Sequence, residues 1–147
     1  MELQQKTKTD TNGLIPPYGG ELKNLIIKDK NLKNDLISKA TYEFECSERN
    51  ACDVELLMVG AFSPLEGFMD ENNYKSVIKN NRDTNGLLFG LPIVFDSNNE
   101  KVKAGETILL TYKKQKIAVL EVSSKWEPDK SLEAELCYGT NSLDHPA

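Results

Sequence analysis

The stretch GAFSPLEGFM, residues 60–69, forms a Ser-Pro corner in which Glu66 is the single charged residue. Surface loops are usually polar, because their backbone groups need water and their side chains have no core to join. A corner as apolar as this one is therefore expected either to be buried within the domain or to face a partner.

Helical patterns flank the corner on both sides. Before it, apolar residues recur at helical spacing up to Gly60, a typical helix stop, which predicts a helix over residues 48–59. After it, Asp70 can cap a second helix whose apolar residues share one face. These residues are Ala51, Val54, Leu57 and Met58 in the first helix and Tyr74, Val77 and Ile78 in the second. The corner is thus predicted to connect two helices.

Two phenylalanines are expected to fix this connection. Phe62 and Phe68 are predicted to pack into the core or against a neighbouring domain. If the Phe68 ring is fully buried, its replacement by alanine should cost about 3 kcal/mol.

The rest of the chain favours short strands. Tyr42, Phe44 and Cys46 alternate with polar residues, as in a half-buried strand. Residues 87–95 are strand-like despite Gly90 and Pro92, and residues 105–112 and 117–122 read as a hairpin with a lysine-rich tip at 113–116. A short helix is expected between residues 22 and 37. Short, mixed strands with glycine-led turns suggest a small barrel, so the expected class is α+β, mainly β.

The composition indicates one globular domain. The 147 residues are 39% hydrophobic and 28% charged, with a net charge of −5. No apolar run approaches the ~20 residues of a membrane helix. Residues 1–12 are polar and lack the apolar region of a signal peptide, which predicts a flexible tail and a cytoplasmic protein. Three cysteines, Cys46, Cys52 and Cys137, form no C-x-x-C pair and are expected to be buried free thiols.

The residues alone show no active site. His145, the single histidine, has no Ser or Cys partner at a recognisable spacing, and no glycine-rich phosphate loop is present. The acidic pairs Asp70/Glu71 and Glu133/Glu135 are interpreted as a helix cap and a solvated face. Trp126 is expected to end the return strand and to close one end of a barrel.

Three motifs, which follow one another along the chain, resemble the motifs of a known protein family. They are Ser47-x-Arg49-x-x-x-Asp53-x-Glu55, the corner Gly60-Ala-Phe-Ser-Pro-Leu-x-Gly-Phe-Met69, and Leu91-Pro-Ile-Val-Phe-Asp96. Together they resemble the N-terminal domain of ATP sulfurylases (sulfate adenylyltransferases), and the resemblance covers residues ~13 to 147. The matching positions, to which it assigns structural or domain-contact roles, are Arg49, Asp53, Gly60, Ser63, Pro64, Leu65, Gly67, Phe68, Pro92, His145 and Pro146.

The resemblance implies a PUA-like β-barrel with short helical insertions over residues 13–147, ahead of a separate catalytic domain. That family makes adenosine 5′-phosphosulfate and pyrophosphate from ATP and sulfate. Its catalytic motif, Gln-x-Arg-Asn-Pro-x-His-x-x-His, is not found in this sequence. We therefore expect no catalytic residue, cofactor or metal site in this chain, and ATP with magnesium in the full enzyme. The expected partners are the catalytic domain of the same enzyme and further copies in a homo-oligomer, with no membrane and no nucleic acid.

Two other interpretations stay open at this point. A free-standing PUA-like module that binds RNA would use the lysines at 113, 114 and 116 and a few lysines between Lys23 and Lys39, although the net charge of −5 favours a merely solubilising tip. A truncated gene product with only a folding or dimerising role is the third. Tyr18 stands where many relatives of the family carry histidine, so no catalytic role is expected there.

Overall fold

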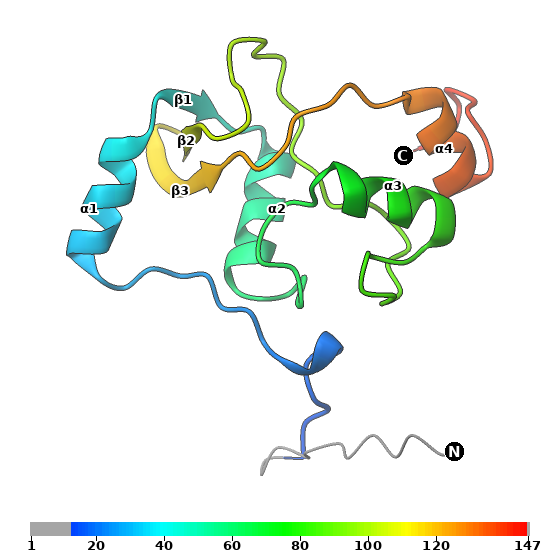
Figure 1. Ribbon diagram of the computed structural model, residues 1–147, viewed down its shortest axis with the longest axis horizontal. Coiled ribbons are helices and arrows are strands. Elements are labelled where there is room, and N and C mark those ends of the chain that lie inside the picture. The colour runs from blue at the N-terminus through cyan, green and yellow to red at the C-terminus, as the bar shows by residue number, and fades with distance from the viewer. Residues whose placement is uncertain (1–12, 147) are drawn as a thin grey trace.

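The computed structural model describes residues 13–146 (Figure 1). Four α-helices and three strands follow a short 3-10 turn at Tyr18–Gly20. They are α1 (Lys30–Lys39), β1 (Tyr42–Glu45), α2 (Glu48–Met58), α3 (Glu71–Asn80), β2 (Thr107–Tyr112), β3 (Gln115–Glu121) and α4 (Lys130–Tyr138). The predicted tail, residues 1–12, lies outside the described residues.

The three strands form one mixed sheet with the order β1-β2-β3. Strand β1 is parallel to β2, and β2 is antiparallel to β3. The β2–β3 hairpin turns through Lys113 and Lys114, whose φ angles of 48° and 64° suit the two-residue turns that match strand twist. The predicted hairpin is confirmed, but its turn is shorter than expected, because Gln115 and Lys116 already belong to β3.

The expected barrel is wrong for the described residues, because the sheet is open and the helices cover more of the chain than the strands do. Residues 87–95 form no strand; Leu88 makes only an isolated bridge with Arg82. Pro92 has no N–H to donate to a ladder and Gly90 weakens a strand, which explains the irregular path. The structure is therefore mixed α/β rather than mainly β.

The helix signals on either side of the corner are confirmed. Ser47 begins α2, where its hydroxyl accepts a hydrogen bond from the N–H of Asn50 at 3.2 Å. Asp70 begins α3 in the same way, accepting from the N–H of Asn73 at 2.8 Å. The buried residues of α3 are Tyr74, Val77 and Ile78, the predicted face.

A compact apolar core lies between the sheet and α2. Its buried members are Cys46, Val54, Val102, Ile108 and Leu110. The buried thiol expected of Cys46 is confirmed, whereas Cys52 is exposed on α2 and Cys137 is half-buried. Among residues 13–146, no helix has the length and apolar character that a membrane span requires.

Candidate functional site

The corner begins where α2 ends. The N–H of Ala61 donates to the carbonyl of Leu56 at 2.8 Å, and that of Gly60 donates to Leu57 at 3.1 Å. This pair of bonds is the Schellman ending, which requires a left-handed residue, and Gly60 supplies it with φ of 83°. Gly60 is thus confirmed as the stop of α2, and the chain reverses into the cis Ser63-Pro64 bond.

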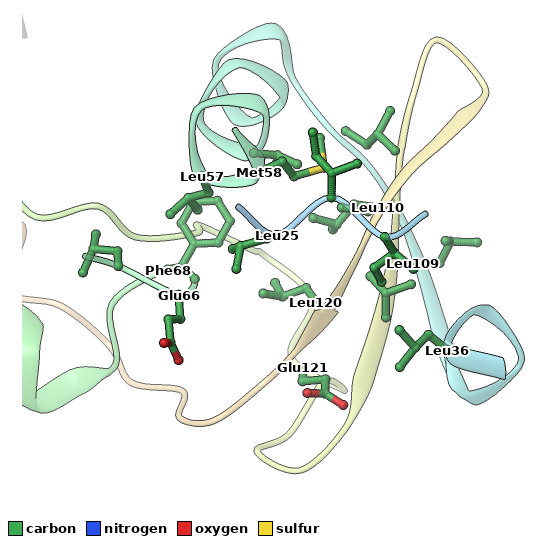
Figure 2. A pocket seen from close by; sticks show the side chains of 18 of the residues that line it. Leu25, Leu36, Leu57, Met58, Glu66, Phe68, Leu109, Leu110, Leu120 and Glu121 are labelled. Atoms are coloured by element: carbon green, nitrogen blue, oxygen red, sulfur yellow. The ribbon is translucent and has the colours of Figure 1, made fainter. Parts of the chain in front are cut away.

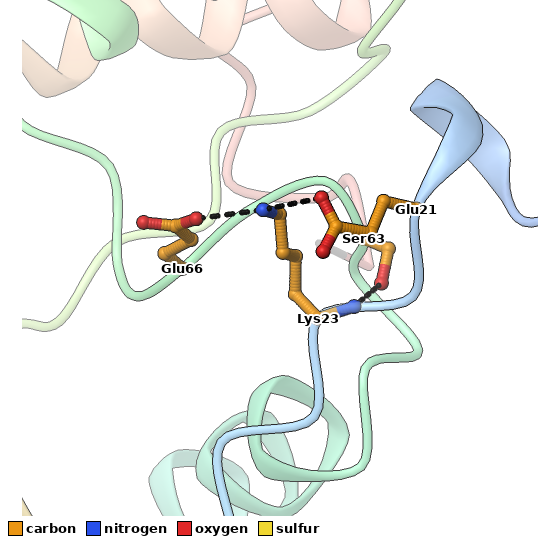
Figure 3. Close-up of polar contacts among 4 residues, drawn as sticks. All are labelled: Glu21, Lys23, Ser63 and Glu66. Atoms are coloured by element: carbon orange, nitrogen blue, oxygen red, sulfur yellow. Dashed lines mark hydrogen bonds and ion pairs between the residues drawn. The ribbon is translucent and has the colours of Figure 1, made fainter.

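An N-terminal segment, residues 19–25, covers the corner (Figure 3). The buried hydroxyl of Ser63 donates to the carbonyl of Gly60 at 2.6 Å and accepts from the N–H of Lys23 at 2.9 Å. Gly19 lies so close to Pro64 that a Cβ added there would be 2.8 Å from its Cγ. The corner is apolar because another part of the same chain is packed over it.

A charged group holds the covering segment at its surface. The Lys23 ammonium lies 3.0 Å from a carboxylate oxygen of Glu21 and 2.9 Å from one of Glu66 (Figure 3). The hydrogen bond to Glu66, and then that to Glu21, raises the pKa of Lys23, and Lys23 lowers the pKa of Glu66. Lys23 is half-buried and both carboxylates are exposed to water, so the two ion pairs contribute little stability and leave the Lys23 charge paired.

Replacing Ser63 by alanine tests this hydroxyl. S63A should lower the free energy of unfolding by about 1–3 kcal/mol, because it leaves the Lys23 N–H and one acceptor site of Gly60 without a partner in a buried place. Urea denaturation followed by far-UV circular dichroism measures the change. The control is S38A, whose exposed hydroxyl bonds only within α1. Equal effects of the two variants would contradict the bridging role.

Phe68 leads from the corner into the core. Its ring lies 5.3 Å from that of Phe95, which lies 5.1 Å from Phe44, measured between ring centroids. Phe68 and Phe62 are both half-buried rather than fully buried. We therefore expect F68A to cost about 1–2 kcal/mol in urea denaturation, less than full burial would give. An unchanged midpoint would mean that the ring contributes nothing to the core.

A wide apolar groove opens beside the corner (Figure 2). Its volume is about 1020 Å³, and it lies between residues 25–27, α1, α2, the corner and the strands β2 and β3. Leu25, Phe68 and Leu120 occupy its middle, while the carboxylates of Glu66 and Glu121 lie at one border (Figure 2). Such a lining suits an apolar partner and offers no cluster of catalytic groups.

The other predicted positions do not gather at the corner. Arg49 is exposed in the first turn of α2, the opposite end of that helix from Gly60, and Asp53 is half-buried one turn further on. Pro92 is half-buried in the irregular segment 87–95. His145 stacks against Tyr138 with ring centroids 5.0 Å apart, and Pro146 is exposed beside it. In residues 13–146, no three His, Cys, Asp or Glu side chains come together as a metal site would need.

Helix α4 was not predicted from the sequence. Neither was its clamp on α3, which is the contact between Tyr74 of α3 and Glu133 of α4. The Tyr74 hydroxyl donates to a carboxylate oxygen of Glu133 at 2.6 Å, so the solvated role expected of Glu133 is wrong. Trp126 packs against Tyr74 with ring centroids 5.2 Å apart, rather than closing a barrel. Asp129 and Gly139 cap the two ends of α4, and these two residues were the available signal.

This clamp predicts a pH dependence. Burial, and then the Glu133 carboxylate, raises the pKa of Tyr74 well above its usual range. In the unfolded chain a tyrosine loses its proton near pH ~10. Above that pH the folded state binds more protons than the unfolded one, so the free energy of unfolding falls as pH rises.

The variant Y74F isolates this effect. Near neutral pH it should cost about 2 kcal/mol, the loss of a hydrogen bond to a charged acceptor. Above pH ~10 the difference from the wild type should shrink, by up to about 1.4 kcal/mol for each pH unit. Urea denaturation across this range measures it; a difference that stays constant with pH would contradict the clamp.

Comparison with known proteins assigns the chain to a family. The family described as PUA-like domain matches residues 15–147. A sulfate adenylyltransferase of Neurospora crassa is 41% identical over 141 residues, which cover 90% of this chain and 24% of the relative. One of Schizosaccharomyces pombe is 40% identical over 134 residues, covering 86% of this chain and 27% of the relative. The chain thus spans about a quarter of the length of these relatives.

The solved structures give a similar result. A hexameric APS kinase from Thiobacillus denitrificans superposes with a TM-score of 0.69 and 31% identity, covering 80% of this chain and 24% of that one. Fold and corner therefore define a small mixed α/β domain of the kind found within longer enzymes. The chain belongs to the PUA-like domain family.

Proposed function

We propose that this chain is the N-terminal accessory domain of a sulfate adenylyltransferase, the enzyme that makes adenosine 5′-phosphosulfate and pyrophosphate from ATP and sulfate. One observation carries the proposal: relatives of that name align with about 90% of this chain but use only about a quarter of their own length for it. A domain of this size relative to the whole enzyme supports the catalytic part rather than replacing it.

The geometry of the corner supports a structural role. Its polar groups are used within the domain, by Ser63 towards Gly60 and Lys23 and by Glu66 towards Lys23. Transfer at a phosphorus atom depends on positioned donors and positive charges facing the substrate. The corner and the groove offer mainly apolar side chains instead, so we assign the chemistry to the rest of the enzyme.

In the full enzyme, ATP with magnesium would bind to the catalytic part, and the reaction would serve sulfate assimilation in the cytoplasm. The first partner of this chain is that catalytic domain. Further copies of the enzyme are the second, and the hexameric neighbour supports self-association of the parent protein.

Two assays test the proposal. The isolated chain, incubated with ATP, sulfate and magnesium, should release no pyrophosphate above the background; robust turnover would show that it is catalytic. The part of the N. crassa relative outside the matched region, produced separately, should bind the chain at micromolar concentrations in isothermal titration calorimetry. A flat titration would contradict the supporting role.

Binding of RNA has weaker support. Lys113 lies over the ring of Tyr112, with its Nζ 4.9 Å from the ring centroid, and the N–H of Lys114 donates to the Glu45 carboxylate at 3.4 Å. An acidic side chain thus borders the lysines of the hairpin tip. Salt-dependent RNA binding, lost when the tip lysines become alanine, would restore this alternative.

A further inference from the structure

We infer that the apolar groove of one copy of this chain receives the N-terminal arm, residues 13–17, of a second copy. The arm has the sequence Gly-Leu-Ile-Pro-Pro and carries no charge. It leads away from the helices and the sheet (Figure 1). Leu14 is 66% exposed and Ile15 is 90% exposed, so the structure leaves both apolar side chains in water.

The arm has a backbone suited to binding in a groove. Pro17 has φ of −56° and ψ of 144°, close to the polyproline II conformation. A segment held extended by two prolines loses little conformational entropy when it docks, which is why such segments are recurrent ligands of apolar grooves. Its five residues span up to about 17 Å, enough to place both apolar side chains along one groove.

The base of the arm is fixed to its own domain at the corner. The Tyr18 hydroxyl donates to the carbonyl of Leu88 at 2.9 Å, and Gly19 lies against Pro64. The chain then passes the corner and lines its own groove with residues 25–27. Residues 18–24 thus separate the arm from the chain's own groove, and the arm leads away from the helices and the sheet (Figure 1), which favours a groove on another molecule.

The groove matches the arm in chemistry. Its middle holds Leu25, Phe68 and Leu120, and Ile26, which also lines it, is 48% exposed. The arm brings Leu14 and Ile15 and no charge that the groove would have to desolvate. Each copy carries both an arm and a groove. If two copies exchange arms, they form a closed two-fold dimer; if each arm binds the groove of the next copy, they form a ring.

The inference concerns the self-association proposed above but stands on these two surfaces alone. The contact is small, so we expect a dissociation constant between about 10 µM and 1 mM. Analytical ultracentrifugation of the whole 147-residue chain under reducing conditions measures it. A wild-type chain that stays monomeric throughout this range would overturn the inference.

Two exposed positions allow substitutions that should not disturb folding. I15D in the arm and I26D in the groove should each weaken self-association by at least about tenfold, because each places a charge in an apolar contact. The matched control, L143D, changes a side chain that is fully exposed outside both surfaces and should leave the association unchanged. Circular dichroism confirms that each variant is folded.

Mixing the two variants gives the sharpest result. A mixture of I15D and I26D contains one intact arm and one intact groove, so it should associate more strongly than either variant alone. Association that is unaffected by I15D, or that is not recovered in the mixture, would overturn the inference. The binding of the chain to the catalytic part is measured separately by calorimetry. A negative result in the self-association experiment would therefore not contradict the proposed function.

Discussion

G60A is expected to lower the free energy of unfolding by about 2–5 kcal/mol. A left-handed backbone costs a residue with a Cβ about 1–2 kcal/mol, and overpacking costs about 1–3 kcal/mol more. The overlap is direct: a Cβ on Gly60 would lie 2.9 Å from the carbonyl oxygen of Lys23 and 2.8 Å from Cδ1 of Leu22. Backbone cannot move aside as a flexible side chain does, so the covering segment would be displaced.

Gly86 provides the matched control for this substitution. Its φ of 86° is close to the 83° of Gly60, but no atom lies within 4 Å of its added Cβ. G86A should therefore show only the backbone cost, about 1–2 kcal/mol. Urea denaturation of both variants separates the two contributions. Equal losses would mean that the close approach of residues 22 and 23 to the corner does not exist.

L110A is expected to have an effect of similar size, about 2–5 kcal/mol. Leu110 lies in the central strand β2 and is 1% exposed, among the core residues between the sheet and α2. Removing its side chain leaves a cavity that rigid neighbours on two sides cannot fill. Thermal and urea denaturation measure the loss.

The control for this substitution is L143A, at a position that is 101% exposed, for which no measurable change is expected. A small effect of L110A, close to that of L143A, would contradict the assignment of the core. Both predictions concern the domain by itself and do not depend on its function.

Local signals were sufficient for the elements around the corner. Ser47, Asp70 and Gly60 act through hydrogen bonds to residues a few positions away, so the sequence predicted where α2 and α3 begin and where α2 ends. The hairpin was predicted for the same reason, because its strands are adjacent in the sequence, although the tip expected over residues 113–116 is a turn of only Lys113 and Lys114. The barrel prediction was wrong because it depended on long-range pairing: residues 87–95 would have had to pair with a strand that is distant in the sequence.

The cover over the corner could not be predicted from the sequence. Ser63 meets the backbone of Lys23, forty positions earlier, and Tyr74 meets Glu133, fifty-nine positions later. Nothing in either pair's local pattern points to the other member. The resemblance drew attention to the motif residues of the corner, but which residues pack over Ser63 and Pro64 became visible only in three dimensions.

The structure shows what the apolar corner does in the fold. It ends one helix, begins the approach to the next and is closed by a segment from the N-terminal part of the chain. A rigid unit of this kind can present the neighbouring groove and the sheet in a constant orientation. That is what an accessory domain needs if it is to support the catalytic part of a larger enzyme.

The central claim is tested most directly by a chimera. In the N. crassa relative, the region that aligns with this chain is replaced by this chain, and the rate of ATP- and sulfate-dependent pyrophosphate release is measured. We expect that the chimera turns over, whereas the relative without the matched region does not. A folded, soluble chimera no more active than the relative without the matched region would contradict the role of this chain as the accessory domain of a sulfate adenylyltransferase.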